Sequence, residues 1–152
     1  MNQKYNIDGV LRKVLKPGRY TGGEYGQIIK NKENIKCRFA FAFPDTYEIG
    51  MSHLGMKILY SLVNAREDAW CERVFAPWVD MEEVMRENSI PLYALESGDA
   101  IKDFDILGFT MQYELSYTNV LNMLDLAGLP IKSKDRTALT PIVIAGGTCV
   151  CN

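Results

Sequence analysis

The sequence predicts an α/β fold in which a parallel β-sheet is covered by helices on both faces. Two observations lead to this prediction. Strand-like and helix-like segments alternate from Cys37 onward, and short connections join them. In addition, residues 37–43 (CRFAFAF) and residues 104–110 (FDILGFT) are apolar at almost every position, which is typical of strands that are buried on both faces.

The length of 152 residues fits one domain with a substantial hydrophobic core. No apolar run approaches the roughly 20 residues that a membrane-spanning helix needs, and the N-terminus has no apolar signal core. We therefore expect a cytoplasmic protein without a membrane partner. The four cysteines are widely scattered, so we expect reduced thiols rather than disulfides.

Charge is distributed unevenly along the chain. Residues 1–38 hold nine Lys and Arg against three Asp and Glu, whereas the remainder is acidic. A basic segment could contact nucleic acid, but this one lacks an Arg-rich run and the closely interleaved aromatic residues of single-strand binders. We favour a segment that packs against its own acidic body, or that stays solvated, over nucleic-acid binding. The chain then divides into a basic arm (residues 1–36) and a main domain (residues 37–152).

The arm has two predicted parts. A short helix that ends before Pro17 follows from the helical spacing of four apolar residues, Val10, Leu11, Val14 and Leu15. The next segment, KPGRYTGGEYGQ, holds four glycines and is expected to form a loop or hairpin on the surface.

The main domain begins with the strand at residues 37–43 and a loop at residues 44–55. A helix at residues 52–66 follows, with Leu54, Ile58 and Leu62 on one stripe. Residues 70–78 (WCERVFAPW) form a second strand that enters a turn. Asp80 then starts a helix that three apolar residues continue, namely Met81, Val84 and Met85.

Three more strands and one helix complete the predicted domain. The strands lie at residues 90–95 (IPLYAL), 104–110 and 141–147 (PIVIAGG). The helix precedes the last strand, starts at Ser116 or Thr118 and ends at Gly128. Its apolar stripe follows the i, i+3, i+4, i+7 pattern through Tyr117, Val120, Leu121 and Leu124.

Ligands of open parallel sheets bind beyond the carboxyl ends of the strands, so the loops at residues 44–55, 110–117 and 146–148 are candidate sites. Each signal is weak by itself. Gly146-Gly147 suits close approach of a ligand but is more often an ordinary turn. His53, the only histidine, could bind a metal or act as an acid or base, but a partly buried structural role is commoner.

Other motifs point to chemistry no more strongly. Asp45 and Glu48 are most simply solvated loop acids, and Cys149-x-Cys151 alone is a weak indication of a metal site. The sequence lacks a dinucleotide fingerprint, a Walker loop and a nucleophile elbow. An independent small-molecule enzyme is therefore the least favoured interpretation.

Several long segments carry a family resemblance. PGRYTGGEY, FPDTYEIGMSHLGMKILYSLVN, WCERVFAPWVDME and DFDILGFTMQYELSYTNVLNMLDLAGLP, followed by VIAGG, resemble in this order the N-terminal region of large bacterial radical S-adenosylmethionine (radical SAM) proteins that are regarded as cobalamin-binding. The resemblance covers residues 16–149. It implies a flavodoxin-like or Rossmann-like domain of the cobalamin-binding type that ends before its last helix.

The resemblance also implies a catalytic barrel that is absent from these 152 residues. That barrel would bind a four-iron four-sulfur cluster through a three-cysteine motif, and would bind S-adenosylmethionine. Because this motif is missing here, the chain alone is not expected to be an enzyme. The domain would instead position cobalamin for the barrel, its expected partner. The reaction and the substrate, which could be a macromolecule, are not assigned.

The resemblance further implies a cobalamin site, although the match to the family pattern is incomplete. Gly146-Gly147 matches, whereas Thr110-Met111-Gln112 stands where related domains have Ser/Thr-x-Leu and departs at Gln112. The axial motif Asp-x-His-x-x-Gly is absent around His53. The expected cobalamin-binding residues are Pro44, Asp45, His53, Gly55, Thr110, Met111, Gln112, Gly146, Gly147 and Thr148.

A docking domain is the rival interpretation. It would bind no cobalamin and would present exposed aromatic residues and the glycine-rich arm to the barrel or to a macromolecular substrate. The aromatic residues concerned are Trp78, Tyr113 and Tyr117. Gln112 and the missing axial motif favour docking, whereas the Gly-Gly segment and the order of domains favour cobalamin. Both interpretations stay open from the sequence.

Overall fold

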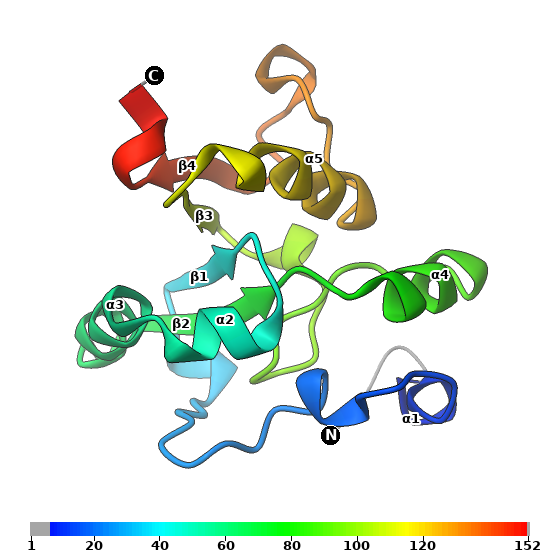
Figure 1. Cartoon of the computed structure of the whole chain (residues 1–152). Helices are drawn as coiled ribbons and strands as arrows, with labels where there is room; N and C mark the ends of the chain where they lie inside the picture. Colours follow the sequence, from blue (N-terminus) through cyan, green and yellow to red (C-terminus); the bar gives the residue numbers. More distant parts are fainter. Residues whose placement is uncertain (1–6, 152) are drawn as a thin grey trace.

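The structure, a computed structural model, describes residues 7–151 and contains one fully parallel sheet in the order β2–β1–β3–β4 (Figure 1). The strands are β1 (Cys37–Phe43), β2 (Ala69–Phe75), β3 (Ile106–Thr110) and β4 (Ile142–Gly146). From β1 the chain adds β2 on one side and later β3 on the other, so the topological switch point lies between β1 and β3. The predicted α/β fold is confirmed.

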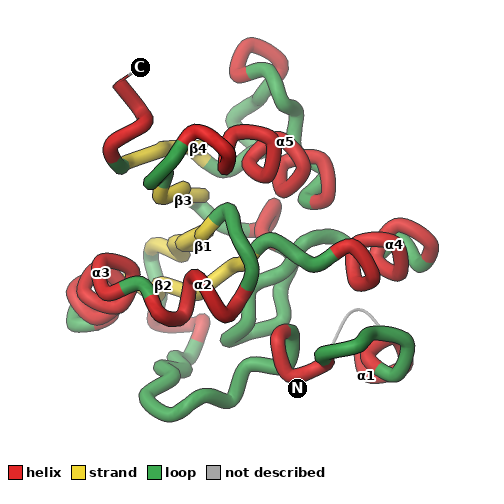
Figure 2. Tube along the Cα trace, in the orientation of Figure 1, coloured by secondary structure: helices red, strands yellow, loops and turns green. Residues whose placement is uncertain are grey.

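Helices pack on both faces of the sheet (Figure 2). On one face lie α2 (Tyr47–Ser52) and α3 (Leu54–Asn64), and on the other lie α1 (Ile7–Leu11), α4 (Val79–Glu87) and α5 (Tyr117–Leu126). Short 3₁₀ turns lie at Pro17–Arg19, Lys32–Asn34, Ile101–Asp103, Glu114–Ser116, Ser133–Asp135 and Thr148–Cys151. Among the described residues, no helix is long and apolar enough to span a membrane.

Side chains of β1 divide the hydrophobic core into two clusters. Ala40 and Ala42 belong to the larger cluster with α1, α4 and α5, whereas Phe41 and Phe43 belong to the smaller cluster with α3. Successive side chains of a strand point to opposite faces, so a strand between two helical layers must be apolar at nearly every position. This explains the continuous apolar run from which β1 was predicted.

Residues 90–95 do not form the predicted strand. Their one bridge joins Tyr93 to Ala100. Their amide groups donate instead to three different elements, with Ile90 bonded to the Met85 carbonyl, Leu92 to that of Leu126 and Leu95 to that of Arg73. The apolar run is buried in the core as irregular backbone, which periodicity alone does not distinguish from a strand.

The predicted helix at residues 52–66 is α3, and extended backbone at His53, with φ −78° and ψ 113°, separates it from α2. Residues 47–52, which were predicted as loop, form α2. The predicted stripe of Leu54, Ile58 and Leu62 is also wrong as the buried face, since all three side chains are exposed. The residues of α3 that are buried are Met56, Tyr60 and Asn64.

The remaining predicted helices differ mainly in their ends. The arm helix forms earlier than expected and leaves Leu15 exposed. The buried face of α4 is the predicted one, namely Met81, Val84 and Met85. In α5 the predicted Leu124 is buried, but Tyr117 and Leu121 are exposed. The turn after α5 has Gly128 at φ +68°, as a glycine stop signal predicts.

The basic arm packs against the acidic body, which is one of the two arrangements expected from the sequence. Lys30 Nζ donates to the carbonyls of Asn64, Arg66 and Ala69, from the end of α3 to the start of β2. The main chain of Ile28 bonds to the Tyr60 hydroxyl and to the Trp70 indole. Because the arm follows the edge strand β2, every residue of that strand is buried.

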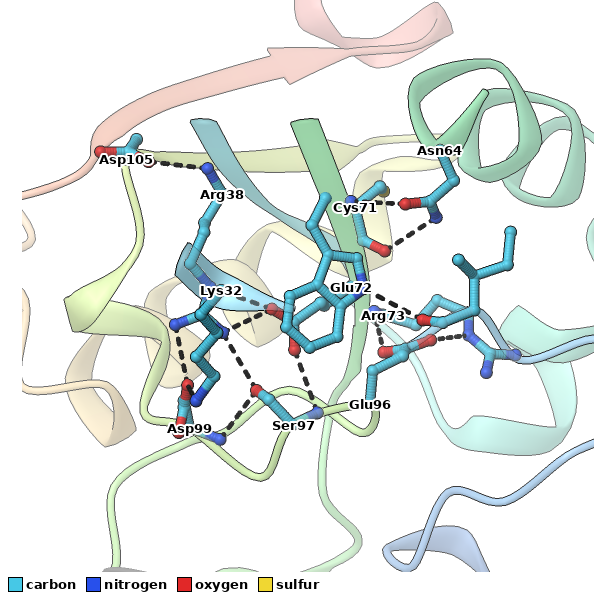
Figure 3. Close-up of polar contacts among 12 residues, drawn as sticks. Lys32, Arg38, Asn64, Cys71, Glu72, Arg73, Glu96, Ser97, Asp99 and Asp105 are labelled. Atoms are coloured by element: carbon cyan, nitrogen blue, oxygen red, sulfur yellow. Dashed lines mark hydrogen bonds and ion pairs between the residues drawn. The ribbon is translucent and has the colours of Figure 1, made fainter. Parts of the chain in front are cut away.

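Two ion pairs are buried beside β2 (Figure 3). Glu72 pairs with Arg38, and Arg73 pairs with Glu96. Each carboxylate also accepts a backbone N–H, from Ser97 and Arg73 respectively. These contacts fix the irregular segment after α4 to the edge of the sheet.

Candidate functional site

A groove of about 340 Å³ lies on the α3 face of the sheet, toward the carboxyl ends of β1, β3 and β4. We call it the strand-end groove. Its floor consists of residues that alternate along the strands, namely Phe39 and Phe41 of β1, Gly108 of β3 and Ile144 of β4. One wall is formed by α3 through Gly55 and Leu59. The lining is mainly apolar, so the groove suits a flat hydrophobic group.

Gly108 determines the shape of the groove floor. A Cβ atom at this position would lie 2.5 Å from Cζ of Phe39 and 3.5 Å from Cγ1 of Ile144. The Phe39 ring therefore extends over β3, into space that any other residue would occupy.

Six of the candidate residues line this groove: His53, Gly55, Thr110, Gln112, Gly146 and Gly147. They come from three separate loops, which the parallel sheet brings together at one edge. Gln112 Nε2 donates to Thr110 Oγ1 at 2.6 Å. Because this hydroxyl accepts one hydrogen bond, its own O–H can donate to a ligand. The groove thus has a polar end beside apolar walls.

The two adjacent glycines have different roles. Gly147 has φ +121°, and a Cβ there would lie 2.2 Å from the carbonyl oxygen of Met111. Gly146 has no atom within 4 Å of a hypothetical Cβ, and it lines the open groove. Gly147 is thus required by the backbone, whereas Gly146 leaves space that a ligand can use.

Met111 and Thr148 adjoin the groove without lining it. The Met111 N–H donates to the Gly146 carbonyl at 2.7 Å, and Thr148 Oγ1 donates to the Gln112 carbonyl at 3.0 Å. Both contacts join the chain after β3 to the chain after β4. Their role in the structure is to hold the two loops in register.

Pro44 and Asp45 lie elsewhere, at the switch point. The Tyr113 hydroxyl donates to the Asp45 carboxylate, and Asn119 Nδ2 donates to the Pro44 carbonyl at 2.9 Å. Burial, together with the neighbouring carboxylate, raises the pKa of Tyr113 to about 12. The structure therefore separates these two candidates from the other eight.

The His53 side chain caps α3. Its Nδ1 accepts the N–H of Met56 at 3.2 Å, and its ring packs against Phe43 with the ring centroids 5.2 Å apart. An acceptor Nδ1 places the proton of the neutral ring on Nε2, so neither nitrogen offers a lone pair to a metal while the cap is made. The partly buried structural role is the one that the structure shows, and Nε2–H remains a donor.

No metal centre emerges from the part of the chain that the structure describes, in which no group of three His, Cys, Asp or Glu side chains could hold an ion. Cys149 is buried next to the groove loops, and the side chain of Cys151 lies outside the described residues. The Cys-x-Cys pair is therefore described only in part.

The groove residues that the sequence analysis missed are Phe39, Phe41, Leu59, Gly108, Phe109, Ile144 and Ala145. A signal for two of them was available. Gly108 and Ile144 lie two positions before the candidates Thr110 and Gly146, and residues two apart in a strand share a face. The period of the strand would have extended the candidate site along the sheet.

Comparisons with known proteins relate this chain to a family. The family described as "Radical SAM proteins, N-terminal" matches residues 55–152. An uncharacterized protein of Methanocaldococcus jannaschii is 26% identical over 123 residues, which cover 81% of this chain and 21% of the relative. The chain thus spans about a fifth of that relative's length. No solved structure matches the chain significantly.

Proposed function

The chain belongs to the family of radical SAM protein N-terminal regions, and from this premise we propose that it positions a cofactor for a radical SAM enzyme. The cofactor that the strand-end groove suits is cobalamin, held by its nucleotide tail. The observation that carries the proposal is the convergence of glycine, threonine and apolar residues on one cavity beyond β1, β3 and β4.

The groove residues fit such a tail in chemistry and in shape. A nucleotide tail has a flat aromatic base followed by a polar sugar and phosphate. The base would lie on the apolar floor, between Leu59 and Ile144, where Gly146 leaves open space. The polar part would meet donors at the groove end, namely the Thr110 hydroxyl and Nε2–H of His53.

Cobalamin, when bound, supplies cobalt-centred methyl-transfer or radical chemistry. The residues of this chain supply position and exclude water. Because Nδ1 of His53 accepts the N–H of Met56, we expect no imidazole from this domain on the cobalt. This agrees with the absence of the axial motif from the sequence.

The test is calorimetric titration of the protein with hydroxocobalamin, with absorbance followed in parallel. Gly146→Leu places a side chain in the groove at a position where a Cβ meets no atom within 4 Å, and Gly18→Leu is its matched control, because a Cβ at Gly18 also meets no atom within that distance. We expect saturable one-to-one binding by the wild type and the control, and binding weaker by roughly tenfold or more in Gly146→Leu, about 1.4 kcal/mol. Equal binding by all three proteins, or no binding by the wild type, would contradict the proposal.

His53 allows a second test in the same titration. His53→Asn keeps a good helix cap but removes the Nε2–H donor, whereas His53→Ala removes both. We expect both variants to bind cobalamin more weakly than the wild type, with only His53→Ala losing stability. Normal binding by His53→Asn would show that the histidine acts through the helix alone.

The docking interpretation keeps support at two of the aromatic residues first considered. Trp78 and Tyr117 are 48% and 37% exposed, although the Tyr117 hydroxyl donates to the Cys149 carbonyl at 2.6 Å. Tyr113 is partly buried and tied to Asp45, and the arm is packed against β2 and α3. A further group of exposed apolar residues lies on α3 and β4.

A further inference from the structure

An apolar surface lies on the outward side of α3 and continues onto β4. In α3 it comprises Leu54, Ile58 and Leu62, which are 69%, 50% and 63% exposed. These residues are one helical turn apart, so they form a continuous stripe. Leu59 is 50% exposed and connects the stripe to the strand-end groove.

On β4, Ile142 and Ile144 extend this surface and are 65% and 48% exposed. Ile144 lines the groove opposite Leu59, whereas Val143 packs on the opposite face of the sheet. Since side chains alternate along a strand, Ile142 points to the same side as Ile144. We call these six residues the α3–β4 face.

Parallel sheets are normally covered on both faces. Here α3 contacts β1 and β2, and in Figure 1 it lies at the level of these two strands, away from β4. The other face of β3 and β4 packs against α5. Among the described residues, no helix covers the α3 side of β4, so its isoleucines remain in solvent.

We propose that an amphipathic helix from the radical SAM polypeptide outside residues 1–152 lies on the α3–β4 face. It would pack beside α3, cover Ile142 and Ile144, and form the outer wall of the strand-end groove. The length of the relative supports this occupant over a second copy of the domain, because the chain spans about a fifth of it and most of that polypeptide lies outside the matched region. The proposal rests on family membership and not on cobalamin.

The test uses the complete radical SAM polypeptide with a photoreactive side chain, Leu62→p-benzoylphenylalanine. The matched control places the same group at Lys13, an exposed residue of the arm outside the α3–β4 face. After illumination, mass spectrometry identifies the linked peptide. We expect an intramolecular link from position 62 to a segment outside residues 1–152 whose apolar residues recur every three or four positions. A link to a second copy, or a yield no higher than that of the control, would overturn the proposal.

A charged variant tests the same surface without depending on one photoreactive position. Ile58→Glu combined with Leu59→Glu should abolish a link made from Ile142→p-benzoylphenylalanine, whereas Lys57→Glu should leave it intact. All three residues are exposed and none belongs to the two buried clusters, although Leu59 also lines the strand-end groove. An unchanged link in the double variant would place the helix elsewhere. The cobalamin titration tests Gly146 and the polar end of the groove, whereas the crosslinking experiments test the α3–β4 face. The cobalamin proposal and the helix proposal can therefore fail independently.

Discussion

The Tyr113 hydroxyl donates a hydrogen bond to the Asp45 carboxylate, and this contact joins the loops that follow β1 and β3. The other oxygen of the same carboxylate accepts the N–H of Thr46 at 2.6 Å. Because β1 and β3 flank the topological switch point, the pair closes the place where ligands of such folds commonly enter. The strand-end groove lies apart from this pair, on the side of β4.

The Tyr113–Asp45 contact predicts a pH dependence at the alkaline end. The pKa of Tyr113 is raised to about 12 by burial and by the carboxylate, above the ordinary value of roughly 10. The stabilisation from the neutral phenol is therefore fully present below about pH 10 and is lost as the pH rises through about 12. Asp45→Asn should lower this pKa, because the phenol then has no neighbouring negative charge. Tyrosinate absorbance at about pH 11 measures the change.

A lower pKa means that Asp45→Asn should give more tyrosinate absorbance than the wild type at the same alkaline pH. Two variants show whether this increase comes from Tyr113. Tyr113→Phe in the Asp45→Asn background should remove it, and Asp103→Asn, at an exposed acid, should leave the titration of the wild type unchanged. A titration curve of Asp45→Asn that overlays the wild type would contradict the contact.

The two adjacent glycines predict opposite results for the same substitution. Gly147→Ala forces a Cβ toward the Met111 carbonyl at a left-handed φ, so it should lower the free energy of unfolding by about 1–3 kcal/mol from backbone strain, or more with the clash. Gly146→Ala meets open space and should change it by less than about 1 kcal/mol. Urea unfolding followed by circular dichroism measures both. Equal losses would refute the assignment of different roles.

The sequence predicts an element correctly where the residues of an apolar pattern all pack in the same way, and it fails where they contact several separate elements. The apolar run of β1 predicts a buried strand because both of its faces pack on helices. The same composition at residues 90–95 fails, since its amides bond to three separate elements. In α3 the sequence carries two apolar stripes, and only the structure shows that the stripe with Met56 and Tyr60 faces the sheet.

The candidate site was likewise predicted only in part from the sequence. The alternation of strands and loops predicts that Thr110 and Gly146 meet at one edge, and they do. The difference between Gly146 and Gly147 depends on the position of the Met111 carbonyl, which no local pattern encodes. Asp45 was expected to bind cobalamin together with these residues, but Tyr113, distant in sequence, holds its carboxylate at the switch point.

Lys30 should be a stabilising residue of the arm although it is a lysine near the surface. Its ammonium donates to the carbonyls of Asn64 at the end of α3, of Arg66 in the following turn and of Ala69 at the start of β2. The Asn64 carbonyl lies at the negative end of the helix dipole, so the charge strengthens that contact. Lys30→Met should lower the free energy of unfolding by about 1.5–3 kcal/mol, the range for hydrogen bonds to charged groups.

Lys13→Met is the matched control for this variant, since Lys13 is exposed and should change stability by less than about 0.5 kcal/mol. Thermal unfolding of the three proteins compares them directly. If Lys30→Met and Lys13→Met unfolded alike, the arm would be only loosely held at this point.

Arg38 and Glu72 form a buried ion pair that a double-substitution cycle can test. Arg38 Nε and Nη2 donate to Glu72 Oε1 at 3.1 and 2.5 Å, and the carboxylate is completely buried (Figure 3). Arg38→Met leaves this charge without its partner, so we expect a loss of about 3–5 kcal/mol in the free energy of unfolding. Adding Glu72→Met removes the unpaired charge and should recover part of that loss, although the Ser97 N–H then loses its acceptor.

The pH dependence of the single variant separates charge from packing. Burial already raises the pKa of Glu72 despite the neighbouring guanidinium, and in Arg38→Met this pKa should rise further, because the positive charge no longer offsets part of the cost of burial. The folded state then binds the proton more tightly, so the variant should be most stable in acid and lose stability as the pH rises through that raised pKa. The double variant lacks the carboxyl and should lose this slope. A pH-independent loss in Arg38→Met would instead assign its effect to packing of the guanidinium over Phe104, whose ring centroid lies 4.0 Å from Cζ.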